Sequence, residues 1–197
     1  MQLTNLTTNI LGKNVSFYSE IDSTQSEIWR RIENNTIVNG SIIIADIQTQ
    51  GKGTHGRTWH TDEPNNISFS IYLQTECALE KLEGITIEIA QILIEILKKE
   101  YGITLEIKAP NDIIYHQKKI GGILTESKVN LETVKFLVIG IGINTNKMNF
   151  TSDIEDLATS IKKEFGIEVD RLKIIEEFCN QFEATIKRRI EDKEGWS

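Results

Sequence analysis

The stretch of sequence that decides the fold is Gly51-Lys52-Gly53-Thr54-His55-Gly56-Arg57-Thr58-Trp59. A β-branched run at residues 42–45 precedes this loop, and a second strand-like run at residues 67–73 follows it. Glycine has no Cβ, so the backbone N–H groups of such a loop can approach a ligand closely. Lys52 and Arg57 supply cationic donors suited to phosphate or carboxylate. The loop therefore predicts a cover over an anionic small molecule; the alternative is a surface hairpin whose glycines only relieve strain.

The glycines of the loop also fit G-x-G-x-x-G, the fingerprint of dinucleotide-binding folds. That fingerprint requires a helix that opens directly after the loop. Residues 58–66 are instead rich in turn formers and have no helical period. A Walker A loop would end in Gly-Lys-Ser/Thr, which this loop lacks. Both of these phosphate-binding motifs are thereby excluded.

The composition of the chain excludes several classes of protein. The chain has 197 residues and a net charge of −7, which argues against general electrostatic binding to DNA. Cys77 and Cys179 have no metal-ligand spacing and are typical of reduced thiols in a cytoplasmic protein. The sequence has neither an apolar stretch long enough to span a membrane nor the pattern of a signal peptide at its start. We therefore expect a cytoplasmic protein that binds neither DNA nor membranes.

Strand-like and helical segments follow one another in an irregular order. Strands are expected at residues 16–21, 41–48, 67–73, 105–108, 113–115, 120–126 and 134–143. Helices are expected after Thr24 and over residues 79–101, 153–165 and 170–190. This order predicts an α+β fold in which helices flank a mixed β-sheet.

Two helix starts carry capping residues. Thr24 and Glu27 have the spacing of a capping box, and Asp170 is suited to cap the last helix. Ser23 and Thr24 could therefore serve the helix alone. A helix N-terminus also offers free N–H donors to a polar ligand, so the two roles are compatible.

Four polar or glycine-rich groups lie near the ends of predicted strands. They are residues 23–25, 48–59, 108–112 with Lys119, and 140–144. Together they predict one site at one edge of the sheet. Asp112 near Lys108 and Lys119 would position these lysines and keep them charged. Lysines that face an anion suit nucleotidyl transfer, because charge grows on the phosphoryl oxygens.

Five motifs, in order, resemble the catalytic domain of biotin–protein ligases. They are Asp22-Ser23-Thr24-Gln25, the glycine loop, Lys108-Ala109-Pro110-Asn111-Asp112, residues 118–126, and Gly140-Ile141-Gly142-Ile143-Asn144. The resemblance implies a fold related to class II aminoacyl-tRNA synthetases and lipoate ligases. It implies that biotin and MgATP form biotinyl-AMP and pyrophosphate. A lysine of a biotin carboxyl carrier protein then attacks the mixed anhydride.

The resemblance also implies roles for individual residues. Biotin would be bound by Ser23, Thr24, Gln25, Gln48, Gly51, Lys52, Gly53, Thr54, Lys119 and Gly122. The nucleotide would be bound by Lys52, Thr54, Arg57, Trp59, Asn111, Lys119 and Asn144. Catalytic roles would fall to Lys119, Arg57, Asp112 and Lys108. The resemblance assigns no protein ligands to Mg²⁺, and we expect phosphates and water to hold it.

Three residues depart from the usual family motifs. Lys52 and Thr54 replace arginines of the loop, and Ala109 replaces a tryptophan. We expect the loss of the arginine at position 54 to weaken retention of the adenylate. Equal retention of biotinyl-AMP by a Thr54→Arg variant would disprove this. Alternatives therefore stay open: a ligase for lipoate or octanoate, a biotin-binding module with weakened ligation, and a plain α+β domain with glycine turns.

The domain organisation follows from the positions of the motifs. The motifs occupy residues 17–146, and C-terminal helices are expected over residues 153–192. Few residues precede the first motif, so we expect no helix-turn-helix domain of the repressor type. The β-barrel that follows the catalytic domain in many members is also expected to be absent. Pairing into a homodimer, frequent in the family, stays open because the sequence identifies no exposed strand.

Overall fold

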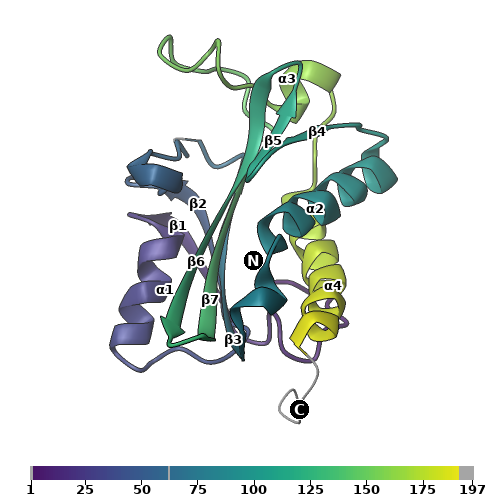
Figure 1. The fold of residues 1–197 in the computed structure, drawn as a ribbon. Coiled ribbons are helices and arrows are strands. Elements are labelled where there is room, and N and C mark those ends of the chain that lie inside the picture. The colour runs from purple at the N-terminus through teal and green to yellow at the C-terminus, as the bar shows by residue number, and fades with distance from the viewer. Residues whose placement is uncertain (1, 62, 191–197) are drawn as a thin grey trace.

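The computed structural model describes residues 2–61 and 63–190. Its centre is a seven-stranded sheet in the order β1-β2-β3-β7-β6-β5-β4 (Figure 1). The strands are β1 (Val15–Ile21), β2 (Ile42–Gln48), β3 (Ile67–Ala78), β4 (Glu106–Lys108), β5 (Asp112–Tyr115), β6 (Lys118–Asn130) and β7 (Thr133–Ile143). β1 and β2 are parallel, and the other neighbouring pairs are antiparallel. The predicted mixed sheet is confirmed.

Helices cover the sheet on both faces. α1 (Thr24–Glu33) packs on one face, where Ile28 meets Ile43 and Val138. α2 (Ile85–Tyr101) and α4 (Arg171–Ile190) pack together on the opposite face (Figure 1). Apolar residues recur on α2 at helical spacing and line its buried side. Each fully buried leucine or isoleucine in this core stabilises the fold by about 1.5–3 kcal/mol.

The expected helix over residues 153–165 is wrong in extent. Only Ile161–Phe165 forms a helix, α3, which Ser160 caps by accepting a hydrogen bond from the N–H of Lys163. The preceding segment turns and pairs with Lys119: the N–H of Lys119 donates to the carbonyl of Leu157, and Thr159 donates to the carbonyl of Lys119. These main-chain groups cannot also serve a helix. The expected residues 191 and 192 lie outside the described part of the chain.

The expected helix over residues 79–101 is divided. Leu79–Leu82 forms a 3-10 turn, η2, and α2 begins at Ile85 after Gly84, whose φ is 73°. Such a left-handed conformation interrupts a helix and favours glycine. Gly102, with φ of 70°, ends α2 as predicted.

The structure confirms the predicted cap of α4 and corrects the predicted cap of α1. Asp170 caps α4, since its Oδ1 accepts from the N–H groups of Leu172 and Lys173. α1 is capped by Ser23, which accepts from the N–H of Ser26, so the predicted capping box at Thr24 is wrong by one residue. The shift leaves the Thr24 side chain to face the sheet. No helix within the described ranges has the length and apolarity that a membrane crossing requires.

Candidate active site

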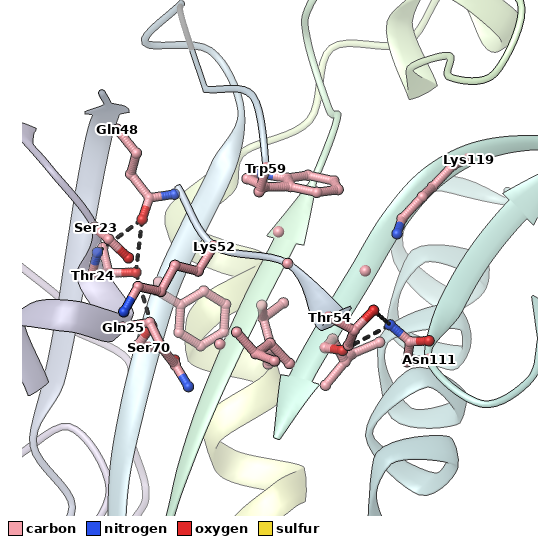
Figure 2. A pocket seen from close by; sticks show the side chains of 18 residues that line it. Ser23, Thr24, Gln25, Gln48, Lys52, Thr54, Trp59, Ser70, Asn111 and Lys119 are labelled. Carbon is pink, nitrogen blue, oxygen red and sulfur yellow. Dashed lines mark hydrogen bonds between the residues drawn. The ribbon is translucent and has the colours of Figure 1, made fainter. Parts of the chain in front are cut away.

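The site lies on the α1 face of the sheet, where small residues replace large ones. Side chains alternate between faces along a strand. The positions on the α1 side of three adjacent strands are Ser68 and Ser70 of β3, Gly140 and Gly142 of β7, and Gly122 of β6. The register pairs Ser68 and Gly122 with Gly142, and Ser70 with Gly140. The missing side-chain volume is therefore contiguous, and a narrow slot forms over it (Figure 2).

One end of the slot is polar. The N–H of Thr24 donates to Gln48 Oε1 at 2.8 Å, and Thr24 Oγ1 lies 2.8 Å from Ser70 Oγ (Figure 2). Ser70 Oγ donates in turn to Gln25 Oε1 at 3.0 Å. Ser23, Thr24, Gln25 and Ser70 are each 3% exposed or less. Buried polar groups of this kind favour a ligand that brings its own donors and acceptors.

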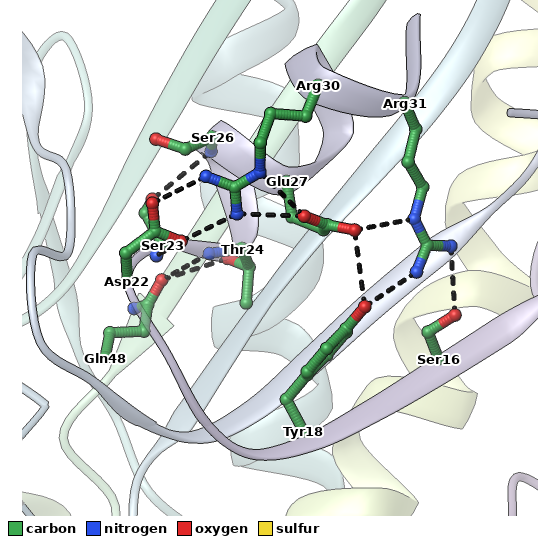
Figure 3. Close-up of polar contacts among 10 residues, drawn as sticks. All are labelled: Ser16, Tyr18, Asp22, Ser23, Thr24, Ser26, Glu27, Arg30, Arg31 and Gln48. Carbon is green, nitrogen blue, oxygen red and sulfur yellow. Dashed lines mark hydrogen bonds and ion pairs between the residues drawn. The ribbon is translucent and has the colours of Figure 1, made fainter. Parts of the chain in front are cut away.

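An ion-pair cluster fixes the start of α1 beside this polar end (Figure 3). Arg30 donates to both carboxylate oxygens of Asp22, at 2.6 and 2.8 Å, while Arg30 and Arg31 both bind Glu27. The hydrogen bonds from Arg30 lower the pKa of Asp22 to about 2. Asp22 Oδ1 also accepts from the N–H of Ser23 at 2.7 Å. The cluster thereby holds the backbone that carries the slot residues.

The β5–β6 hairpin aims Lys119 at the other end of the slot. Asp112 pairs with Gly122 and Ile114 with Lys119, so β6 carries one extra residue, a β-bulge. Residues three apart on a regular strand face opposite sides. The extra residue brings Lys119 to the side of Gly122. A Cβ on Gly122 would lie 3.0 Å from Lys119 Nζ, so the glycine gives the lysine room.

Lys119 pairs with a carboxylate and lies near an aromatic ring. Its Nζ is 2.6 Å from Asp112 Oδ1 and 5.7 Å from the centroid of the Trp59 ring. Both contacts hold the amino group of Lys119 in position. The structure thus brings Asp112 against a lysine, as the sequence predicts.

The glycine loop folds back over the slot. The N–H of Trp59 donates to the carbonyl of Gly51 at 2.8 Å, and that of Gly53 to Arg57 at 2.7 Å. The ring of Trp59 lies close to Gly142, where an added Cβ would come within 2.3 Å of it. Its Nε1 is buried without a hydrogen-bond partner among the described residues, so it can donate to a ligand. The loop lies over the slot, and no helix directly follows it within the described residues 58–61 and 63–66.

A second and wider cavity, of about 240 Å³, adjoins the slot. Gly53, Thr54, Trp59 and Lys119 line both cavities. The remaining walls of the wide cavity are Arg57, Thr58, His60, Asn144, Lys147, Phe150, Ile154, Leu157 and Ala158. Lys119 and Trp59 therefore stand at the border between a polar slot and a larger, more apolar space. This arrangement suits a ligand with two parts and a reacting centre at Lys119.

The sequence-predicted site residues differ in where they lie. Ser23, Thr24, Gln25, Gln48, Lys52, Gly53, Thr54, Trp59, Asn111, Lys119 and Gly122 line the slot. Arg57 and Asn144 line the wide cavity, and the side chain of Arg57 folds back to donate to Thr54 Oγ1 at 2.8 Å. Gly51 lies outside both cavities and closes the loop. Lys108 is exposed on β4 and lines neither cavity.

Sequence reasoning missed two parts of the site. Ser70 lines the slot but belongs to none of the five motifs, although the alternation Ile67-Ser68-Phe69-Ser70-Ile71 signals a strand with one polar face. The walls at Phe150, Ile154 and Leu157 gave no usable signal, because a helix was expected over 153–165.

Three comparisons with known proteins agree with this geometry. Residues 17–144 match the Biotin/lipoate A/B protein ligase family. The bifunctional ligase/repressor BirA of Bacillus subtilis is 33% identical, over 90% of this chain and 55% of the relative. The biotin–protein ligase of Homo sapiens is 32% identical, over 86% of this chain and 24% of the relative.

A solved structure shares the fold. The biotin protein ligase from Aquifex aeolicus in complex with biotin and ATP superposes with a TM-score of 0.75 at 28% identity, over 92% of this chain and 73% of that one. The chain spans about half the length, 55%, of the BirA proteins from Bacillus subtilis and Bacillus spizizenii. The family match covers well over half of the residues. The chain belongs to the biotin/lipoate A/B protein ligase family.

Proposed function

We propose that the protein is an ATP-dependent biotin–protein ligase. The observation that carries the proposal is the position of Lys119, at the border between a polar slot and a wider cavity. Biotin would occupy the slot and the nucleotide the wide cavity. The carboxylate of biotin and the α-phosphate of ATP would then meet at the lysine. The biotin protein ligase from Aquifex aeolicus, whose structure is a complex with biotin and ATP, supports this assignment.

In the first step, a carboxylate oxygen of biotin attacks the α-phosphorus, and the bond to the pyrophosphate oxygen breaks. Negative charge grows on the phosphoryl oxygens, and the ammonium of Lys119 stabilises it. Asp112 positions this lysine at 2.6 Å. Trp59 shields the reacting centre from water on the loop side. Lys108 has no role in this step, because it lines neither cavity.

In the second step, the amine of an acceptor lysine attacks the carbonyl carbon of biotinyl-AMP, AMP leaves, and the amine gives up a proton. We propose that the acceptor belongs to a biotin carboxyl carrier protein. Mg²⁺ enters with ATP, held by phosphates and water. Within the described residues no group of three or more His, Cys, Asp or Glu side chains could hold a metal.

The polar end of the slot favours biotin over lipoate or octanoate. Biotin ends in a cyclic urea with two N–H donors and a carbonyl acceptor, whereas the other acids end in a dithiolane or a methyl group. An apolar end would displace water from Ser23, Thr24 and Gln48 without replacing its hydrogen bonds, which is costly. A cytoplasmic location belongs to the proposal and rests on the two buried free thiols, Cys77 and Cys179.

Pairing of two copies is a further part of the proposal. β1 and β4 are the edge strands of the sheet, so each leaves backbone groups available for a second chain. Analytical ultracentrifugation with and without biotin and ATP measures this directly.

Exchange of labelled pyrophosphate into ATP tests the first step. We expect biotin-dependent exchange in the wild type and a loss of roughly 100- to 1,000-fold in Lys119→Ala, since one stabiliser of developing charge is removed. Lys118→Ala is the matched control, because Lys118 is adjacent and its Nζ binds the carbonyl of Glu155 outside both cavities.

Three other results would change the assignment. Exchange with lipoate or octanoate but not with biotin would identify a different acid. Biotin binding without exchange would identify a binding module. Neither binding nor exchange would remove the biotin assignment altogether.

A further inference from the structure

We propose that Arg171 anchors the segment through which the glycine loop returns to β3, and that this anchor sets how long the closed loop retains its ligands. We call residues 63–66 the return segment, since they lie between the loop and β3. The inference rests on the proposed function for the identity of the ligands, biotin, ATP and biotinyl-AMP. Arg171 is the first residue of α4, lies outside the family match at residues 17–144 and lines neither cavity. It is therefore a positioning residue.

Arg171 joins the return segment to β2. Its Nη1 donates to Asp46 Oδ1 and to the carbonyl oxygen of Asn66, both at 3.0 Å. This nitrogen of a guanidinium group carries two hydrogens, so both bonds form at once. Asp46 lies two residues before Gln48, which ends β2 and lines the slot. One side chain of α4 therefore ties the strand that leads into the glycine loop to the segment that leads out of it.

The return segment is also bonded to the chain beside the wide cavity. Asn66 Oδ1 accepts from the N–H of Thr145 at 3.1 Å. The carbonyl oxygen of Asn65 accepts from the N–H of Asn146 at 3.1 Å and from Thr145 Oγ1 at 2.7 Å. Asn144, the preceding residue, lines the wide cavity. The slot, the glycine loop and the wide cavity are thus connected through the return segment.

The start of α4 gives Arg171 a fixed base. The side chain of Asn146 accepts from the N–H of Val169 at 2.8 Å and donates to its carbonyl oxygen at 3.0 Å. The N–H of Asp170 donates to the hydroxyl of Tyr101, at the end of α2, at 3.0 Å. α4 itself packs against α2 in the main core. Arg171 therefore reaches the return segment from an element that does not move with the loop.

The hydrogen bonds of the glycine loop, by contrast, are largely internal. They join Trp59 to Gly51 and Gly53 to Arg57, while the contact with the far wall, from Asn111 Nδ2 to Thr54 Oγ1, is long at 3.5 Å. Such a loop opens and closes as a unit about its two ends. If the return segment moved with it, the loop could close in several positions, and the ligands beneath it would leave sooner.

Hydrogen exchange in the ligand-free protein tests the anchor. The N–H groups of Thr145 and Asn146 report on the return segment, because both donate to it. In Arg171→Ala, we expect both to exchange roughly 10-fold faster than in the wild type, since local opening then costs less free energy. The rates are compared with those of the β7 amides, which report on unfolding of the sheet.

Arg189→Ala is the matched control on the same helix. Arg189 lies at the opposite end of α4, where it donates to Glu88 at 2.5 Å and to the carbonyl oxygens of Lys81 and Glu83. It therefore makes the same kinds of bond, to a carboxylate and to main-chain oxygens, away from the site. Its loss should leave the exchange of Thr145 and Asn146 unchanged relative to β7, even where it lowers stability as much as Arg171→Ala does.

Release of biotinyl-AMP tests the consequence for the ligands. The preformed complex is mixed with an excess of unlabelled biotinyl-AMP, and the loss of labelled ligand is followed in time. We expect release roughly 10-fold faster from Arg171→Ala than from the wild type. Release from Arg189→Ala should match the wild type, because a general loss of stability does not change the rate at which the folded protein releases its ligand.

Asp46→Ala tests the same contact from its other side. It should shift exchange and release in the same direction as Arg171→Ala. The double variant should be no worse than Arg171→Ala alone, because both substitutions remove one shared interaction. Effects that add in the double variant would overturn the anchor as a single contact between α4, β2 and the return segment.

The remaining outcomes separate the anchor from its role. Wild-type exchange in folded Arg171→Ala overturns the anchor, and if that variant does not fold, Asp46→Ala gives the decision. Faster exchange with wild-type release overturns the role in retaining ligands. A wild-type protein that does not bind biotinyl-AMP overturns the proposed function and the role in retention with it, while the exchange rates still decide on the anchor.

Discussion

The two faces of strands β3 and β7 differ in what they contribute to the protein. Toward α2 and α4, Phe69, Ile71 and Ile139 are buried in the main core. Toward α1, the intervening positions include Ser70 and Gly140, and the slot lies over them. One face contributes stability through filled volume, whereas the other contributes a binding site through volume left empty. Substitutions at adjacent residues of one strand should therefore change different quantities: the free energy of unfolding on the core face, and the affinity for the ligand on the α1 face.

Ile139→Ala should have the largest effect on stability. Its side chain is fully buried in the core, so truncation leaves a cavity and should lower the free energy of unfolding by about 2–5 kcal/mol. Urea unfolding measures the change. Affinity for biotin, measured where the variant is folded, should stay close to that of the wild type. A large loss of affinity with little loss of stability would contradict the separation of the two faces.

Gly140→Ala, at the next residue on the opposite face, should show the reverse. Its new Cβ would lie 2.8 Å from Gln25 Oε1, which forces the amide to move. We expect roughly 10-fold weaker binding of biotin, which corresponds to about 1.4 kcal/mol. The free energy of unfolding should change less than in Ile139→Ala. If both variants lose stability equally, the empty face also serves the core.

The smallest effect should come from the ion pair beside the slot. Arg30 lowers the pKa of Asp22 from 3.8 to about 2, so the carboxylate stabilises the folded state above pH 4. This contribution is lost as the pH falls from about 4 toward 2. The side chains are 35% and 45% exposed, so solvent limits the effect to below about 1 kcal/mol.

Unfolding of Asp22→Asn and the wild type at pH 7 and pH 3 measures this contribution. The difference in stability should be larger at pH 7 and should shrink at pH 3. A difference that grows at pH 3 would mean that the carboxylate is not stabilised by Arg30 in the folded protein.

The sequence predicts most of the fold because its signals are local. Alternating apolar residues mark the strands, and Gly102 and Asp170 mark helix ends. It also places Lys119 and Asp112 near each other, since a short hairpin joins them. Glycines 122 and 142 predict a close approach, though not which group approaches. Lys119 and Trp59 fill those places in the structure.

The remaining features depend on pairing between distant segments. The bulge that turns Lys119 toward the slot exists only in the register of β5 with β6. The wall at Leu157 forms because its backbone bonds to Lys119, and this pairing overrides an amphipathic pattern. Ser70 becomes part of a binding site only when β3 lies beside β7 and under α1. None of these contacts is encoded in a local stretch.

The bond between the wall of the wide cavity and Lys119 has a consequence for motion. The amide hydrogens of Lys119 and Thr159 lie in one two-bond bridge, which links the reactive lysine to the segment at residues 157–159. If this segment opens to admit a nucleotide, both amides lose their protection from hydrogen exchange in the same event. A nucleotide that closes the segment should slow both exchange rates by the same factor. Lys119 and the segment at residues 157–159 would then open and close together in each turnover.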